Sequence, residues 1–275
     1  YNGLAVQLTR RFTRDLSFNA AYTWSHNIDD ATAVVNSTAI TPRRGQDFYN
    51  LSADRSSSLL DRRQRLSLTT IYDAGWFKQG NWFLKNIVGN WTISGTYTYE
   101  SPEMATVQSG VDSNLNGDTA GDRAIINVGG AAMQGSGVYG VDKNGNRIGT
   151  GGSTNPNIVA YVATNPGARY ILAGLGAYAN GGRNTFPLSP IDNIDAGLTK
   201  RFNVSERMKL EFGGQFFNLL NHSQFIPGLL SDLTGETFVG AGRNFLIPGN
   251  AAFGQYSQFF PSNSRQVQMV AKFTF

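Results

Sequence analysis

The chain of 275 residues carries 23 basic and 19 acidic side chains, a net charge of +4, and its 15% of charged residues falls well below the usual quarter or so. Aromatic residues make up 12%, glycines number 32, and no apolar run approaches the roughly 18 residues that a membrane-spanning helix needs. The composition therefore argues against helical spans. It also argues against a nucleic-acid partner, because no Lys/Arg run with interleaved aromatic residues stands out, and the absence of cysteine removes disulfide and thiolate chemistry.

The first half of the chain contains four segments in which apolar side chains recur at every second residue. This spacing predicts strands with one apolar and one small or polar face. The two longest, Leu16–Ser25 and Asn90–Glu100, have the length of a tilted strand that crosses a membrane. In chain order the apolar positions are Leu4, Val6, Leu8, Leu16, Phe18, Ala20, Tyr22, Trp24, Leu66, Leu68, Trp91, Ile93, Gly95, Tyr97 and Tyr99.

Three further alternating segments follow in the second half and bring the predicted number of strands to seven. Their apolar positions are Ile194, Ala196, Leu198, Met208, Leu210, Phe212, Phe216, Val267, Met269, Ala271, Phe273 and Phe275. If Leu210 and Phe212 lie near the middle of a bilayer, an arginine at either position is expected to cost about 2–4 kcal/mol. The last strand, Arg265–Phe275, ends on an aromatic residue.

A soluble β-sandwich would show similar alternation, but three features favour an antiparallel transmembrane β-barrel. Several strands run to ten or eleven residues, when strands average about five or six. Aromatic residues gather near strand ends, and the connections alternate between short and long, as in outer-membrane barrels. The aromatic residues are Phe12, Tyr22, Trp24, Tyr72, Trp76, Trp91, Tyr97, Tyr99, Phe202 and Phe273.

The lengths of the links orient the predicted strands. The long links are Asn27–Arg63, Ser101–Pro190 and Asn221–Ser264, and the shorter ones are Phe12–Asp15, Asp73–Gly89 and Asn203–Glu206. Outer-membrane barrels have short periplasmic turns and long extracellular loops. The last strand is therefore expected to descend to a periplasmic Phe275, and the first strand also to descend, from an extracellular Tyr1.

Two edge strands that run the same way cannot pair antiparallel, so seven such strands cannot close a barrel. Open edges are not tolerated in lipid, because each unpaired peptide group costs several kcal/mol there. The chain also begins at Tyr1 without an initiator methionine or a signal peptide. We therefore expect residues 1–275 to be the C-terminal part of a barrel, with an odd number of strands upstream.

Several segments carry recognisable residue runs in a consistent order. Tyr22-Thr-Trp-Ser25 ends a predicted strand before an acidic loop, and Asp61-Arg-Arg-Gln64 begins the next predicted strand. The segment Gly181–Phe225 contains three more such runs, Arg183-Asn184, Lys200-Arg201-Phe202 and Phe217-Asn-Leu-Leu-Asn-His222. Together these runs resemble Oar-like TonB-dependent receptors of Gram-negative bacteria, which carry a carboxypeptidase-regulatory-like domain. Gln64 replaces a usual histidine, and Glu100-Ser101-Pro102 departs from a usual Ser-Gly-x-Pro.

The resemblance covers most of the chain outside Ala124–Asn180 and Ile226–Asn263. It implies a barrel of about 22 strands with a plugged lumen, in which a plug and a TonB box couple import to the TonB complex. Neither plug nor box lies in this sequence. The implied partners are outer-membrane lipid, the missing strands and plug, the TonB complex, and the barrel-assembly machinery that reads Phe275. Alternatives are a passive channel, an adhesin barrel or a secreted calcium-binding β-protein.

One loop has the spacing of a metal site. Its candidate oxygen ligands are Asp112, Asn114, Asn116, Asp118 and Asp122. Alternate ligands with Gly117 at the sixth position match the first half of a calcium loop, but Arg123 stands where a bidentate Glu is expected. The same residues are ordinary turn formers, and a plain turn is the favoured interpretation. Asp142–Asn146 is predicted to be a hairpin turn.

No catalytic motif is present, and neither an enzyme nor a cofactor is expected. His26 and His222 stand outside any His-Glu-x-x-His pattern, and we expect loop hydrogen bonds for both. Tyr170–Gly176 only superficially resembles a dinucleotide fingerprint and is predicted to be a loop. Four charged residues are expected to face the lumen near the periplasmic rim, and an ordinary role as polar lumen residues is favoured over contact with a plug: Asp195, Arg201, Lys209 and Glu211.

Overall fold

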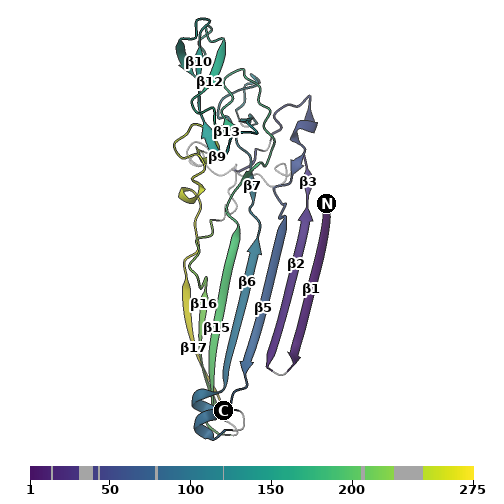
Figure 1. Ribbon diagram of the computed structural model, residues 1–275, viewed down its shortest axis with the longest axis vertical. Coiled ribbons are helices and arrows are strands. Elements are labelled where there is room, and N and C mark those ends of the chain that lie inside the picture. The colour runs from purple at the N-terminus through teal and green to yellow at the C-terminus, as the bar shows by residue number, and fades with distance from the viewer. Residues whose placement is uncertain are drawn as a thin grey trace.

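The computed structural model describes residues 1–13, 15–30, 40–42, 44–77, 80–119, 121–205, 208–225 and 244–275. The molecule is elongated, with long strands side by side at one end and the long links folded together at the other (Figure 1). We call the described residues of the links 27–63, 101–190 and 218–265 the head. Within the described part of the chain, no helix has the length and hydropathy to cross a membrane.

Seven long antiparallel strands form the main sheet, as predicted. In their order across the sheet they are β1 (Asn2–Thr13), β2 (Leu16–His26), β5 (Gln64–Ala74), β6 (Trp91–Glu100), β15 (Ile191–Asn203), β16 (Lys209–Phe217) and β17 (Gln266–Thr274). Every neighbouring pair is antiparallel, so the two edge strands β1 and β17 run in the same direction. The start of β1 lies at the head and the end of the chain lies at the opposite end (Figure 1).

The register confirms the predicted faces. Ile93 lies opposite Leu198 on one side and Tyr72 on the other, and Leu66 lies opposite Tyr22 and Tyr99. A slip of one residue would move every side chain to the other face, so these pairings keep the apolar positions of all seven strands together. The sheet therefore has one apolar face and one polar face. Lys200 is a charged exception on the apolar face, opposite Trp91 and Phe212.

The long links were predicted as loops, but they contain short strands in small sheets. The paired elements are β3 (Ile28–Asp29) with β4 (Ser56–Ser57), β7 (Met104–Ala105) with β14 (Phe186–Pro187), β8 (Ile125–Ile126) and β9 (Ala131–Ser136) with β13 (Ala168–Ile171), and β11 (Arg147–Thr150) and β12 (Ala160–Ala163) with β10 (Val138–Val141). The head also contains the 3-10 turns η1 (Leu51–Asp54), η3 (Asn244–Leu246) and η4 (Tyr256–Gln258). The loop prediction was wrong for Tyr170 and Ile171, which belong to β13.

The head has a hydrophobic core of its own, to which all three long links contribute. Its buried members are Ile40, Leu59, Ala105, Val107, Ala124, Tyr170, Phe186, Leu188, Phe245, Leu246 and Phe260. The rings of Tyr170, Phe186 and Phe253 have centroids 5.6–5.8 Å apart in tilted and edge-on arrangements. Such aromatic contacts add directional packing to the area they bury. The head is thus a folded unit rather than three independent loops.

A short helical segment, also absent from the prediction, interrupts the link between β5 and β6. Its last five residues form η2 (Leu84–Val88), and it lies at the end of the sheet opposite the head (Figure 1). Asn81 caps it, because its Oδ1 accepts the Leu84 N–H at 2.9 Å. The Gly89 N–H closes it by donating to the Leu84 carbonyl at 2.8 Å.

Candidate functional site

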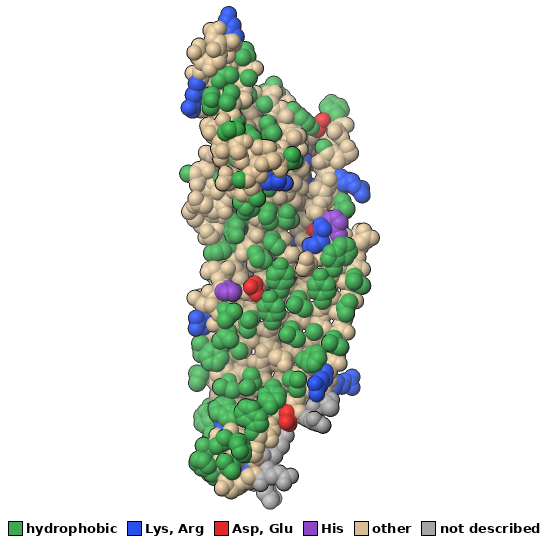
Figure 2. Space-filling model, viewed as in Figure 1, with side chains coloured by type: hydrophobic (Ala, Val, Ile, Leu, Met, Phe, Trp, Pro, Cys, Tyr) green, Lys and Arg blue, Asp and Glu red, His purple; other side chains and the backbone are tan. Residues whose placement is uncertain are grey.

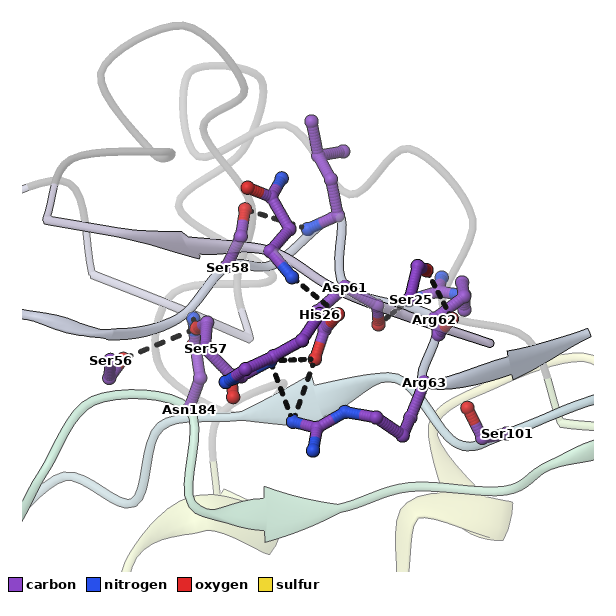
Figure 3. A network of polar contacts seen from close by, with 12 residues as sticks. Ser25, His26, Ser56, Ser57, Ser58, Asp61, Arg62, Arg63, Ser101 and Asn184 are labelled. Carbon is purple, nitrogen blue, oxygen red and sulfur yellow. Dashed lines mark hydrogen bonds and ion pairs between the residues drawn. The ribbon is translucent and has the colours of Figure 1, made fainter. Parts of the chain in front are cut away.

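A polar network joins the head to the ends of β2 and β5 (Figure 3). The Arg63 Nη2 donates to His26 Nδ1 at 2.8 Å and to Asp61 Oδ2 at 3.2 Å, while the Asn27 N–H donates to Asp61 Oδ1 at 2.9 Å. His26 Nδ1 also lies 3.3 Å from Asp61 Oδ2, so the three side chains contact one another. The expected loop hydrogen bond of His26 is confirmed, and it holds two neighbouring strand ends together.

Arg62 extends this network to the end of β6. Its side chain pairs with Glu103 at 3.1 Å and approaches Glu100 at 3.9 Å, and Glu100 also pairs with Arg65 at 2.5 Å. Burial raises the pKa of the Glu103 carboxyl, and the positive charge of Arg62 opposes that shift. The Asp61-Arg-Arg run that carries part of the family resemblance therefore has a structural role at the junction of head and sheet.

Two buried arginines tie the long links to one another inside the head. Arg123 pairs with Asp54, and both side chains are almost completely buried. Arg183 pairs with Asp29 and donates from Nε to the Asp54 carbonyl at 3.0 Å. Desolvation, with a smaller contribution from the charge of Arg183, lowers the pKa of Arg123 to about 10, so the guanidinium remains charged at neutral pH.

Asn184, the other half of the Arg183-Asn184 run, joins three segments of the head. Its Oδ1 accepts hydrogen bonds from the hydroxyls of Thr41 at 2.9 Å and Thr106 at 3.0 Å, and its Nδ2 donates to the Ser57 carbonyl at 2.8 Å. Its backbone has a φ of +53°, a left-handed conformation that asparagine tolerates better than most residues. This run therefore organises the head, which the sequence did not reveal.

The candidate calcium loop is built as a series of turns. Asp112 accepts the N–H groups of Asn116 at 3.0 Å and Gly117 at 2.8 Å, and Asn116 Oδ1 accepts the Asp118 N–H at 2.8 Å. Asn114 Oδ1 likewise accepts the Asn116 N–H at 3.1 Å.

The acidic residues at the end of this loop also have protein partners. Asp118 pairs with Arg44, and the buried Asp122 accepts the Ser113 N–H at 3.1 Å. Among the described residues, no three His, Cys, Asp or Glu side chains lie together as metal ligands. The contacts favour the turn interpretation, and the calcium site stays a prediction.

The buried Asp122 leads to a pH-dependent prediction. Burial raises its pKa above the 3.8 of an ordinary aspartate, so its contribution to stability is present at low pH and is lost as the pH rises through the folded-state pKa. The Asp122→Asn variant has no carboxyl group at this position that could ionise, so it does not lose stability in this way. We expect the variant head to gain stability relative to the wild type between pH 3.8 and neutrality, measured by protease resistance across that range.

Asp142→Asn provides a control with the opposite sign. Hydrogen bonds from Asn146 lower the pKa of Asp142, so its stabilising contribution is lost as the pH falls. Asp142 caps the turn between β10 and β11 by accepting the Asn146 N–H at 2.8 Å, which confirms the predicted hairpin turn. A wild type and an Asp122→Asn variant with parallel pH profiles would contradict the prediction for Asp122.

The head contains an open cavity of about 510 Å³ beside β12, near the tip farthest from the sheet (Figure 1). Among the described residues, its lining carries no charged side chain and consists of Leu115, Ile125, Ser153, Thr154, Asn155, Ile158, Val159, Ala160, Tyr161, Leu175, Gly176 and Ala177. The Tyr161 hydroxyl donates to the Leu175 carbonyl at 3.1 Å, and burial raises its pKa, so it stays neutral. The lining mixes apolar side chains with the polar groups of Ser153, Thr154, Asn155 and Tyr161, which suits a small, uncharged ligand that has hydrogen-bonding groups.

Charged residues were predicted to lie near the periplasmic rim, at the end of the sheet with the short turns, and the structure places only some of them there. Arg201 and Glu211 form an ion pair at 2.8 Å on the polar face, close to the short turn. Asp195 was placed wrongly, because it lies in the half of β15 nearer the head and accepts the Asn218 N–H at 2.8 Å. His222 Nδ1 lies 3.7 Å from Asp192 Oδ2, too far for the expected side-chain hydrogen bond, while the His222 backbone N–H donates to Asn218 Oδ1 at 3.0 Å.

Long antiparallel strands with one apolar and one polar face, short turns at one end and a folded head at the other define a transmembrane β-barrel protein. The chain belongs to the outer membrane beta barrel domain family, whose model matches residues 1–268. It is an outer-membrane protein, with the apolar face toward lipid, the head outside the cell and the turns in the periplasm. No curated protein and no solved structure matches the chain.

Proposed function

We propose that this chain is part of a receptor that binds a small, uncharged substrate outside the cell and imports it with energy from the TonB complex. The observation that carries the proposal is the folded head, whose uncharged cavity lies beyond the extracellular end of the strands. A binding site that is already ordered avoids the entropy cost of ordering loops around a ligand. The resemblance to Oar-like receptors supports the coupling to TonB.

The sheet supports a barrel with more strands than these seven. Because β1 and β17 run in the same direction, they cannot pair antiparallel with each other, and open edges are not stable in lipid. We infer that upstream strands complete the barrel and that a plug fills its polar interior. Phe275 is 92% exposed and stacks on Phe273, which leaves it accessible to the barrel-assembly machinery.

The test uses the full-length protein and the purified periplasmic domain of TonB. We expect the two to bind in detergent solution, measured by isothermal titration calorimetry, because an energy-coupled receptor must contact TonB from the periplasm. The control is an unrelated outer-membrane porin titrated under the same conditions. Absence of binding, together with steady ion conductance in planar bilayers, would instead establish a passive channel and overturn the proposal.

A further inference from the structure

The link between β5 and β6 exposes several large apolar side chains at the periplasmic end of the sheet. Trp82 is 63% exposed, Phe83 58% and Trp76 51%, and Ile87 beside them is also exposed. Hydrophobic side chains gather at this end of the molecule and over the neighbouring strands (Figure 2). A contiguous apolar patch of this kind marks an interaction surface, since soluble surfaces rarely expose one.

Two separate contacts place this link on the lipid-facing side of the sheet. Lys200 stands on the apolar face, and its Nζ donates to the Ile87 carbonyl at 3.0 Å and to the Gly89 carbonyl. The ring of Trp76 packs on Tyr72, with centroids 6.2 Å apart, and Tyr72 lies opposite Ile93 on the same face. The exposed side chains are therefore continuous with the surface that the barrel presents to lipid.

The helical segment is held firmly in this position. Asn86 is almost completely buried, its Oδ1 accepts the Asn203 N–H at 2.9 Å, and its Nδ2 donates to the Trp82 carbonyl at 3.2 Å. Lys200 Nζ also lies 4.8 Å from the ring centre of Trp91 and 5.4 Å from that of Phe202. Carbonyl oxygens and aromatic faces compensate the lysine charge, which explains its presence on an apolar face.

We propose that Trp76 and the segment Trp82–Val88 form an anchor in the periplasmic leaflet of the outer membrane, with phospholipid as the ligand. The apolar side chains would contact acyl chains, and the exposed Lys85 would meet the phosphate groups. Tryptophan favours this interfacial depth, because its ring is apolar and its N–H is polar.

A lipid-facing groove beside the anchor fits the same ligand. It has a volume of about 390 Å³, starts at Trp91 and Lys200, and runs over Leu198, Phe212 and Met269. Gly214 and Ala271 keep it open, since neither has a large side chain. The anchor and the groove thus form one surface for phospholipid. The charge of Lys85 lies at its periplasmic end, and the acyl-chain contacts lie toward the membrane centre.

The anchor is testable by lipid quenching of Trp82 in the full-length protein, reconstituted into phosphatidylcholine and phosphatidylglycerol vesicles. The difference in fluorescence between the wild type and Trp82→Phe isolates the emission of Trp82. We expect phospholipids brominated near the headgroup to remove most of this emission and acrylamide in the water to remove little. Phenylalanine keeps the site apolar, so the variant is expected to fold.

Tyr49→Trp in the head provides the matched control, because Tyr49 is fully exposed to water at the opposite end of the molecule. Its added emission should respond to acrylamide and not to brominated lipid. If Trp82 behaved in the same way as this control, the segment would lie in water and the anchor would be wrong. If neither quencher reached Trp82, the segment would be covered by protein, which would also overturn the proposal.

Discussion

Leu68→Arg is expected to destabilise the protein by about 2–4 kcal/mol, because a lipid-facing arginine near the bilayer midplane must be buried in hydrocarbon. Leu68 lies at the middle of β5, opposite Ala20 and Tyr97 on the apolar face. The measurement is a denaturant titration of the full-length barrel in phospholipid vesicles.

The neighbouring residue on the polar face provides the control. Thr69 lies opposite Asn19 and Thr96, and Thr69→Arg should change the stability by no more than about 0.5 kcal/mol, because this face is polar and turned away from lipid. Equal losses for the two arginine variants would contradict the assignment of the faces. Leu210 and Phe212 are poorer test positions than the sequence suggested, because they lie near the periplasmic end of β16, where the penalty falls.

Arg123→Ala is expected to destabilise the head by about 3–5 kcal/mol, because it leaves Asp54 as a buried charge without its partner. The side chains of Arg123 and Asp54 are 1% and 3% exposed, so water cannot replace the lost ion pair without opening the head. Hydrogen exchange of the full-length protein should show faster exchange in residues 101–190 and unchanged protection in the seven long strands.

Two further variants serve as controls for the Arg123→Ala prediction. Arg44→Ala removes an exposed arginine from its pair with Asp118 and should cost less than about 1 kcal/mol. The double substitution Arg123→Met with Asp54→Leu should be less damaging than Arg123→Ala, because it removes both buried charges together. A head that exchanges equally in Arg123→Ala and in the wild type would contradict the structural role of the pair.

The strands of the main sheet could be predicted from sequence because their physical requirement is local. A strand between lipid and a polar interior must alternate apolar and polar side chains along its own length. Tyr22, Leu66 and Tyr99 follow this alternation within their own strands and also lie opposite one another across the sheet. The short turns made β1–β2 and β15–β16 neighbours, whereas β2–β5, β6–β15 and β16–β17 pair across the long links.

The head could not be predicted in this way, because its core depends on contacts between distant segments. Ile40, Val107 and Phe245 come from three different links, and none of the three lies in a long segment of alternating apolar residues. The helical segment was missed for a different reason. Asn81 before Trp82-Phe83-Leu84 is a capping pattern, but a helix of so few residues gives too little periodicity to recognise.

The shared core of the head constrains the order in which the protein folds. Ile40 and Phe260 are separated in sequence by most of the chain, and β5, β6, β15 and β16 lie between them. Contacts over such distances form late, because the loop-closure entropy must be overcome before they stabilise anything. The core is therefore completed only after all three long links have been translocated through the membrane, and its closure marks the end of assembly on the cell surface.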